Sequence, residues 1–273
     1  MNLLHAIVLG ALQGFTEVLP ISSSAHLLIV PRLAGWPESG LTFDVALHLG
    51  TFLALAAYFR RDILEMCLSA VEAAVSRSFA TPALRLPFLV ILSCIPAGIV
   101  GKLFEHHIEE LFRTNLLLVA LFLTAFGIIL GLVDTLGRKR DPLDRLSAPG
   151  ALVIGLMQCL ALIPGVSRSG ITITAGLALG FTREAAARFS FLMSLPIVAG
   201  AALLKTLQLF KHGIPAGEGL PLLAGIAVSA VTGYISVAFL LRLVQKNSLS
   251  VFVWYRVIAG GVLIAALMGG MVR

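Results

Sequence analysis

Two short polar strings interrupt a sequence that is otherwise strongly apolar. The first covers residues 13–26 and contains a carboxylate at Glu17, three consecutive serines and an imidazole at His26. The second covers residues 164–170 and places Arg168 between two serines, with glycines further out on both sides. Charged side chains within apolar segments are costly and mark functional sites by default. These two strings are therefore the candidate site.

The first string opens with an amide and a carboxylate. Gln13 and Glu17 stand four residues apart, so they share one face if residues 6–17 form a helix. A glutamate within an apolar segment is costly unless it is paired, protonated or bound to a cation. The alternative is a glutamate at a hydrated helix end, hydrogen-bonded to a nearby loop. The functional interpretation is favoured because ionisable residues within membrane segments usually have a functional role.

A proline and a run of serines follow this pair. Pro20 would end the first helix, and one of Ser22, Ser23 and Ser24 would cap a second helix. The free N–H groups and the dipole at the start of that helix would favour an anion. His26 lies in its first turn and could transfer a proton near neutral pH.

The second string carries the stronger signal for an anion site. Gly165 and Gly170 permit unusual backbone angles and close approach to a ligand. Ser167 and Ser169 offer hydroxyls, and Arg168 offers a planar fork of donors that suits phosphate oxygens. A helix that begins just after this loop would point its N-terminus at the ligand.

Together the two strings offer a carboxylate, an imidazole, a guanidinium, several hydroxyls and two helix N-termini. This set suits a phosphate ester or a diphosphate. The alternative role for Arg168 is a structural charge paired with Glu17. Neither a P-loop nor a GxGxxG turn between a strand and a helix is present, so nucleotide use is not expected. The residues predicted to contact the substrate are Ser22, Ser24, Gly165, Ser167, Ser169, Gly170 and Thr172.

The elements that position these strings are predicted to be membrane helices. Of the 273 residues, 58% are apolar and 12% are charged, which is about half the charge of a soluble domain. A helix needs roughly 20 apolar residues to cross a bilayer. The predicted fold is therefore an all-α polytopic membrane protein. Six transmembrane helices are predicted at residues 45–59, 86–101, 114–133, 189–204, 219–241 and 257–272.

Two further regions, residues 6–31 and 149–182, are apolar but are cut by the polar strings. Each is predicted as a re-entrant helix–loop–helix segment, with its loop at membrane depth. Irregular backbone is tolerated there only if it is buried in protein or lines a wet cavity. The alternative is an ordinary span with a kink. The cost of placing Glu17, His26 and Arg168 in lipid favours the re-entrant interpretation.

The two halves of the chain, about 1–136 and 149–273, repeat weakly and are joined by a charged loop at 137–148. They are predicted to form a single membrane domain. An odd number of crossings per half would give an inverted repeat, whose broken helices meet at the ligand site. Chance similarity between helices rich in glycine and serine is the alternative. The matching pairs are Gly10 and Gly155, Gln13 and Gln158, Ser22 and Ser167, and Ser24 and Ser169, with Phe43 and Leu49 matching Phe189 and Leu195 one position further on.

Four other polar residues lie near the ends of predicted spans. Asp44 and His48 share a helical face and form either a supporting pair for the site or an interfacial pair that faces water. Tyr255 and Arg256 open the last span and are predicted as interfacial anchors.

The formal net charge is +6. Basic loops, such as those around Arg60, Arg61 and Arg77, explain this charge through the positive-inside rule. Because such loops occur at several places, charge alone does not orient the chain. Nucleic acid is not expected as a partner, because the basic residues are scattered and form no patch with interleaved aromatic residues.

Both polar strings resemble motifs of the undecaprenyl-diphosphate phosphatase family, also called bacitracin-resistance proteins. The matching strings are QGFTEVLPISSSAHL at 13–27 and PGVSRSG at 164–170. Weaker matches are FDVALHLGT at 43–51 and WYR at 254–256. Length, number of spans and their order agree, so the resemblance covers nearly the whole chain.

The resemblance implies hydrolysis of undecaprenyl diphosphate to undecaprenyl phosphate and phosphate, which recycles the lipid carrier of bacterial cell-wall synthesis. It implies a polyprenyl diphosphate partner and a site in the bacterial inner (plasma) membrane that faces the periplasm. It also implies a divalent metal, Mg²⁺ or Ca²⁺, at Glu17 and Gln13. Some members of the family have Glu at the first of these two positions, so Gln13 weakens a site of two carboxylates. A homodimer is left open.

The catalytic residues of the family fall on Glu17, Ser23, His26 and Arg168. In the implied mechanism, Ser23 attacks the terminal phosphorus, His26 or Glu17 takes its proton, and Arg168 binds phosphate. Direct attack by a metal-bound water is the alternative. Ala25 stands where glycine is usual, a small departure that would stiffen the loop. The leading alternative function is a lipid flippase or transporter, because inverted repeats with broken helices are transporter architecture.

Overall fold

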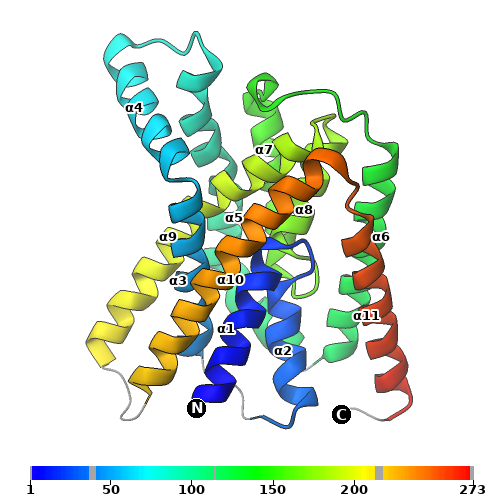
Figure 1. Cartoon of the computed structure of the whole chain (residues 1–273). Coiled ribbons are helices and arrows are strands. Elements are labelled where there is room, and N and C mark those ends of the chain that lie inside the picture. Colours follow the sequence, from blue (N-terminus) through cyan, green and yellow to red (C-terminus); the bar gives the residue numbers. More distant parts are fainter. Residues whose placement is uncertain (1, 37–40, 114, 213–217, 271–273) are drawn as a thin grey trace.

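The computed structural model describes residues 2–36, 41–113, 115–212 and 218–270. The described chain is helical apart from its turns and loops and one isolated bridge between Asp141 and Phe181 (Figure 1). This confirms the all-α fold. The helices are α1 (Leu3–Val18), α2 (Ser23–Leu33), α3 (Leu41–Tyr58), α4 (Arg60–Ser76), α5 (Pro82–Arg113), α6 (Leu116–Leu136), η1 (Leu143–Arg145), α7 (Ala148–Gln158), η2 (Cys159–Leu162), α8 (Arg168–Ala178), α9 (Arg183–His212), α10 (Gly219–Lys246) and α11 (Ser250–Met268).

Four helical stretches of the described chain are long and apolar enough to cross a bilayer. They are Pro82–Phe104 within α5, and the whole of α6, α10 and α11. Large apolar side chains such as Ile91, Ile95 and Ile99 project outward from α5, as expected for a helix that faces lipid. A polytopic membrane protein is therefore confirmed. The helices α3 and α9 contain the other two predicted spans, and their crossing of the bilayer stays a prediction.

Each polar string joins two short helices that turn back inside the bundle. Figure 1 shows the loop after α1 at mid-height of the bundle, with α2 running back beside α1. The helices α7 and α8 form a second pair of the same kind, and the two helices of each pair contact one another. Two half-length helices on either side of a buried loop are the geometry predicted for residues 6–31 and 149–182. Whether each pair enters and leaves one face of a bilayer stays a prediction.

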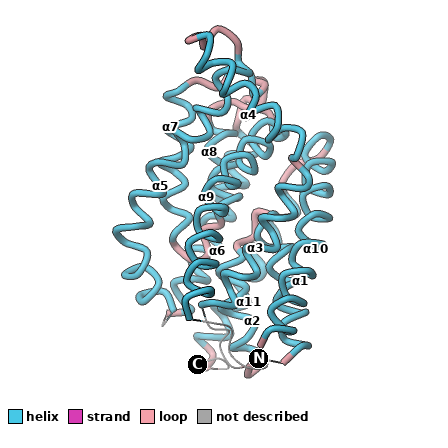
Figure 2. Tube along the Cα trace, turned by 90° about the vertical axis from the view of Figure 1, so that its left-hand side faces the viewer, coloured by secondary structure: helices cyan, strands magenta, loops and turns pink. Residues whose placement is uncertain are grey.

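The helix α4 was missed in the sequence, where residues around Arg60, Arg61 and Arg77 were expected to form loops. Both views place α4 at one end of the molecule, beyond the bundle and opposite the start of α1 (Figures 1 and 2). Its apolar residues recur at helical spacing, as in Leu64 and Leu68, but charged residues lie between them. A search for uninterrupted apolar runs overlooks a helix of this kind.

The two broken segments contact the rest of the bundle through glycines. A Cβ atom on Gly10 of α1 would lie 2.6 Å from the carbonyl oxygen of Gly225 in α10. A Cβ atom on Gly155 of α7 would lie 2.3 Å from the carbonyl oxygen of Ser93 in α5. Small residues allow membrane helices to approach closely where apolar burial cannot drive association. Gly10 and Gly155 are a matching pair of the weak sequence repeat, so the repeat coincides with a shared mode of packing.

Candidate active site

The two loops have nearly the same φ angle at the residue that precedes each second helix. Ser22 and Ser167 have φ angles of 75° and 74°, which are left-handed values that non-glycine residues rarely adopt. The Oγ atoms of Ser22 and Ser24 lie 3.2 Å apart, as do those of Ser167 and Ser169. These four serines are matching pairs of the sequence repeat. Backbone strain of this kind costs about 1–3 kcal/mol per residue and persists only where surrounding contacts hold it.

The two loops differ in how the first turn of the following helix is capped. Ser167 Oγ accepts a hydrogen bond from the Gly170 amide at 3.1 Å and so caps α8. Ser22 Oγ instead accepts from the Gly165 amide at 3.1 Å and thereby bridges the two loops. The expectation that a serine side chain caps the second helix of the first string is therefore wrong, because Ser22 makes no such bond to α2. The N-terminus of α2 keeps its capacity to bind an anion.

Glu17 is the centre of the polar contacts between the loops. Its side chain is 7% exposed, and one carboxylate oxygen, Oε1, is paired with the guanidinium of Arg168. The other oxygen, Oε2, accepts from the hydroxyl of Ser23 and from Gln13 Nε2 at 3.2 Å. His48 Nε2 lies 3.5 Å from the same oxygen. The structure thus brings the acid and serine of the first string to the arginine of the second.

The pairing of Arg168 with Glu17 is the structural role that the sequence left open for this arginine. A buried ion pair leaves an uncompensated charge if one partner is removed, which is strongly destabilising. It does not prevent ligand binding, because a guanidinium has five N–H donors and a phosphate can share them with a carboxylate.

A small cavity lies beside this ion pair. Its volume is about 10 Å³, which is room for about one water molecule. Besides Glu17, Arg168 and Ser169, its polar lining comes from Ser190 and Ser194 of α9. These two serines are not among the residues predicted from the sequence. The sequence repeat contained a signal for them. The spacing that matches Phe43 with Phe189 also matches Asp44 with Ser190 and His48 with Ser194.

His26 is buried, but its partners are not those expected of a base for Ser23. Its Nδ1 lies 2.7 Å from the carbonyl oxygen of Ser22, and its Nε2 lies 2.5 Å from the hydroxyl of Tyr255. Because a carbonyl oxygen only accepts, Nδ1 carries the proton, and Nε2 of a neutral ring accepts from Tyr255. Tyr255 therefore contributes to the site, although its position at the start of a span suggested an interfacial anchor.

The prediction that Arg256 is an interfacial anchor is wrong. The residue is 0% exposed and is the largest fully buried side chain in the described chain. Its guanidinium donates only to backbone carbonyl oxygens, among them those of Pro20 and Gly165 in the two loops. A basic residue next to Trp254 and Tyr255 has the pattern of a membrane-interface belt. This pattern led to the prediction of an anchor, although Arg256 binds the two loops.

The remaining predicted residues divide between the site and its framework. His48 contacts Glu17, which supports the interpretation of a supporting residue, while the side chain of Asp44 lies outside the described residues. Thr172 Oγ1 contacts Ser190 Oγ at 2.6 Å and so links α8 to α9. Gly165 has a φ angle of 100°, and a Cβ atom there would lie 2.5 Å from the Val119 carbonyl oxygen. Gly165 is thus required by the loop itself.

The donors around Glu17 fit a divalent metal only in part. The described residues contain no group of three or more His, Cys, Asp or Glu side chains that could hold a metal ion. Gln13 Oε1 is buried and has no hydrogen-bond partner in the described chain, so it could serve as an oxygen ligand. Mg²⁺ is often held by one or two carboxylates together with phosphate oxygens of the substrate. Glu17 and Gln13 alone therefore do not complete a metal site, and phosphate oxygens of a substrate would have to supply the remaining ligands.

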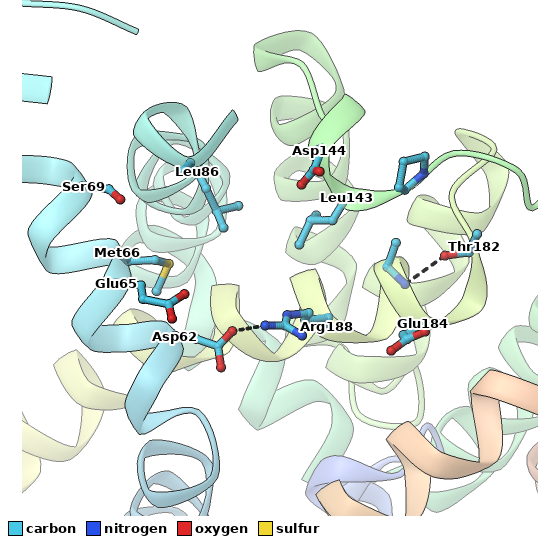
Figure 3. Close-up of a pocket in the computed structure, with 13 residues that line it drawn as sticks. Asp62, Glu65, Met66, Ser69, Leu86, Leu143, Asp144, Thr182, Glu184 and Arg188 are labelled. Atoms are coloured by element: carbon cyan, nitrogen blue, oxygen red, sulfur yellow. Dashed lines mark hydrogen bonds and ion pairs between the residues drawn. The ribbon is translucent and has the colours of Figure 1, made fainter. Parts of the chain in front are cut away.

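A larger cavity of about 360 Å³ lies elsewhere, between α4, α5, η1 and the start of α9 (Figure 3). Four carboxylates line it, and Figure 3 shows one of them, Asp62, paired with Arg188. An acidic lining repels a diphosphate. None of the residues predicted for the site lies in this cavity, so its size does not make it the candidate site. The carboxylates are Asp62, Glu65, Asp144 and Glu184.

Comparison with known proteins connects this site to one family. Residues 6–262 match the family described as "Bacitracin resistance protein BacA". A protein named undecaprenyl-diphosphatase from Pelobacter propionicus is 70% identical over 99% of this chain and 99% of its own length. Proteins with the same name from Geobacter metallireducens and Moorella thermoacetica are 62% and 48% identical, each over 97% of this chain and 98% of their own length. Since one family spans almost the whole chain, including both loops, the chain belongs to the bacitracin resistance protein BacA family.

Proposed function

We propose that this chain hydrolyses undecaprenyl diphosphate to undecaprenyl phosphate and inorganic phosphate. The observation that carries the proposal is the contact of one buried carboxylate, Glu17, with both the Ser23 hydroxyl and the Arg168 guanidinium. A base, a nucleophile and a phosphate-binding group thereby meet at one point. The name undecaprenyl-diphosphatase for a relative that is 70% identical over 99% of the chain supports the same activity.

The surroundings of the site suit a lipid that carries a diphosphate. The open N-terminus of α2 and the guanidinium of Arg168 attract the charged head group. The apolar outer faces of α5, α6, α10 and α11 keep the site within reach of a polyprenyl chain in the bilayer. The matched φ angles of Ser22 and Ser167 support a repeat of residues 1–136 and 149–273, which we propose to be inverted. We place the site in the bacterial inner membrane, open toward the periplasm.

The first chemical step transfers the terminal phosphoryl group to Ser23. The Oγ atom of Ser23 attacks the terminal phosphorus, and Glu17 accepts the hydroxyl proton through the hydrogen bond that joins them. The bond between that phosphorus and the bridging oxygen breaks, and undecaprenyl phosphate leaves with the bonding electrons. Arg168 stabilises the negative charge spread over the transferring phosphoryl oxygens.

The second step returns the enzyme to its starting state. The leaving lipid phosphate takes the proton from Glu17, which then accepts a proton from water as that water attacks phosphorylated Ser23. The bond between Ser23 Oγ and phosphorus breaks, Glu17 returns the proton to Ser23 Oγ, and inorganic phosphate leaves. In the alternative route, Glu17 activates water for direct attack on the diphosphate and Ser23 only positions it.

Glu17 is a better candidate than His26 for the proton acceptor. Both ring nitrogens of His26 are occupied, one by the Ser22 carbonyl oxygen and one by the Tyr255 hydroxyl. We assign His26 and Tyr255 to holding the first loop, where Ser22 has its left-handed backbone conformation.

We assign the proposed divalent metal, Mg²⁺ or Ca²⁺, to Glu17 and Gln13 Oε1 together with phosphate oxygens of the substrate. When bound, such an ion would neutralise part of the charge of the diphosphate and polarise its oxygens. The amide of Gln13 contributes an oxygen ligand without a second negative charge.

The first prediction concerns the Arg168→Ala variant. We expect it to release phosphate from undecaprenyl diphosphate at least about 100-fold more slowly than the unmodified chain, because loss of a pre-organised charge donor has an effect of that size. The measurement is inorganic phosphate released by purified protein in detergent, with farnesyl diphosphate as a second substrate. Arg145→Ala is the matched control, because Arg145 lies in an exposed ion pair with Asp141.

A full rate of release by Arg168→Ala would exclude Arg168 as the phosphate-binding group. If the unmodified chain binds the lipid and releases no phosphate in the presence of Mg²⁺ or Ca²⁺, the enzyme assignment is wrong. A transporter or flippase would then explain the site.

The second prediction separates the two chemical routes. Ser23→Ala removes the nucleophile, so we expect turnover to fall by at least about 10³-fold, as for other catalytic groups that act as a unit. Acid quenching of the unmodified enzyme during turnover should trap a phosphate on the peptide that contains Ser23, detected by mass spectrometry. Near-normal turnover by Ser23→Ala would rule out the covalent route and leave direct attack by water.

The third prediction concerns Tyr255, which the sequence did not identify as part of the site. Tyr255→Phe removes the donor to His26 Nε2 and keeps the ring, so we expect kcat to fall by about tenfold, the factor for about 1.4 kcal/mol. Tyr234→Phe is the control, because its ring packs against Tyr58 and not against His26. Equal kcat values for the two variants would show that the hydroxyl of Tyr255 has no part in the reaction.

A further inference from the structure

Arg256 joins the backbones of the two loops. Its Nη1 donates to the carbonyl oxygen of Pro20 at 3.2 Å, in the loop that precedes Ser23. Its Nη2 donates to the carbonyl oxygens of Gly165 and Val166 at 2.8 and 3.0 Å, in the loop that precedes α8. One planar guanidinium is therefore shared between segments that are about half the chain apart in sequence.

The rest of the bundle is shaped around this side chain. Arg256 Nε donates to the carbonyl oxygen of Leu123 in α6 at 3.0 Å, which fixes the guanidinium from a third side. A Cβ atom on Gly127 of α6 would lie 2.8 Å from Arg256 Cβ. A Cβ atom on Gly170 of α8 would lie 2.8 Å from Arg256 Nη1. Both helices therefore carry glycine where this arginine needs space.

A fully buried arginine without a carboxylate partner is costly. The ion pairs identified in the described chain do not include Arg256, and its four hydrogen bonds all go to carbonyl oxygens. Transfer of a charged group from water to the protein interior costs several kcal/mol, even after the surrounding protein relaxes. A neutral side chain would fill this space at a lower cost, so the guanidinium is expected to have a function beyond packing.

We propose that Arg256 is a positioning residue that fixes the distance between the two loops, so that Ser23 and Arg168 act on the same phosphoryl group. The inference rests on the proposed function. Pro20 lies three residues before Ser23, and Val166 lies two residues before Arg168, so the carbonyl groups held by Arg256 adjoin both functional side chains. A displacement of about 1 Å between reacting groups can lower a rate by about 100-fold.

Two glycines of α6 provide a test that leaves Arg256 and the loops unmodified in sequence. Gly127→Ala places a Cβ atom against Arg256, whereas Gly131→Ala places one 2.9 Å from Val253 Cγ1, one turn further along the same contact between α6 and α11. We expect both variants to lower the thermal unfolding midpoint in detergent by similar amounts. Gly127→Ala should lower kcat for phosphate release by about tenfold or more with KM changed less than about twofold, and Gly131→Ala should leave kcat unchanged.

Direct replacement gives the second measurement. Arg256→Lys keeps the charge but loses the planar fork that reaches both loops, so kcat should fall by about 100-fold at a similar KM. Arg183→Lys is the control, because Arg183 forms a partly buried ion pair with Asp134 outside the loops. If Arg256→Lys does not fold, the two glycine variants decide the question alone.

The possible results separate this inference from the proposed function. If the unmodified chain releases no phosphate, the proposed function fails. If the unmodified chain is active and Gly127→Ala and Gly131→Ala have equal kcat values, Arg256 only supports the fold and the inference is wrong. A fall in kcat confined to Gly127→Ala and Arg256→Lys supports the positioning role.

Discussion

The whole arrangement depends on satisfying polar groups inside an apolar bundle. Two loops of irregular backbone and a pair of opposite charges are buried inside this bundle, where each polar group needs a partner within the protein. Arg168 neutralises Glu17, and Arg256 binds the carbonyl groups of both loops. Ser22 accepts from the Gly165 amide. The groups that make the loops stable are thus the same groups that bring their side chains together.

This constraint explains why the site is shared between the halves of the chain. Neither loop can satisfy its own backbone, so each is completed by the other and by α11. The first loop supplies the carboxylate Glu17 and the hydroxyl of Ser23, and the second supplies the guanidinium of Arg168. Under the proposed function, a diphosphate would bind between these side chains, whose positions are already held by the contacts between the loops.

The parts of this structure that follow from local pattern could be predicted, and the parts that follow from long-range contact could not. The helices α6 and α10 follow from uncharged runs, and the contact of Glu17 with Arg168 follows from the two polar interruptions of the sequence. The amphipathic helix α4 has no such run and was missed. Arg256 was assigned to the membrane interface, because its sequence neighbours do not reveal the carbonyl groups that it binds.

The central claim is that Glu17 and Arg168 act as one unit on a single phosphoryl group. A double-mutant cycle of Glu17→Gln and Arg168→Gln, measured as kcat/KM for phosphate release from undecaprenyl diphosphate, tests it most directly. Because residues in direct contact are coupled, the double variant should be no more than about threefold slower than the slower single variant, as for groups that act as a unit. If the two losses in rate multiply, the residues act independently and the account is wrong.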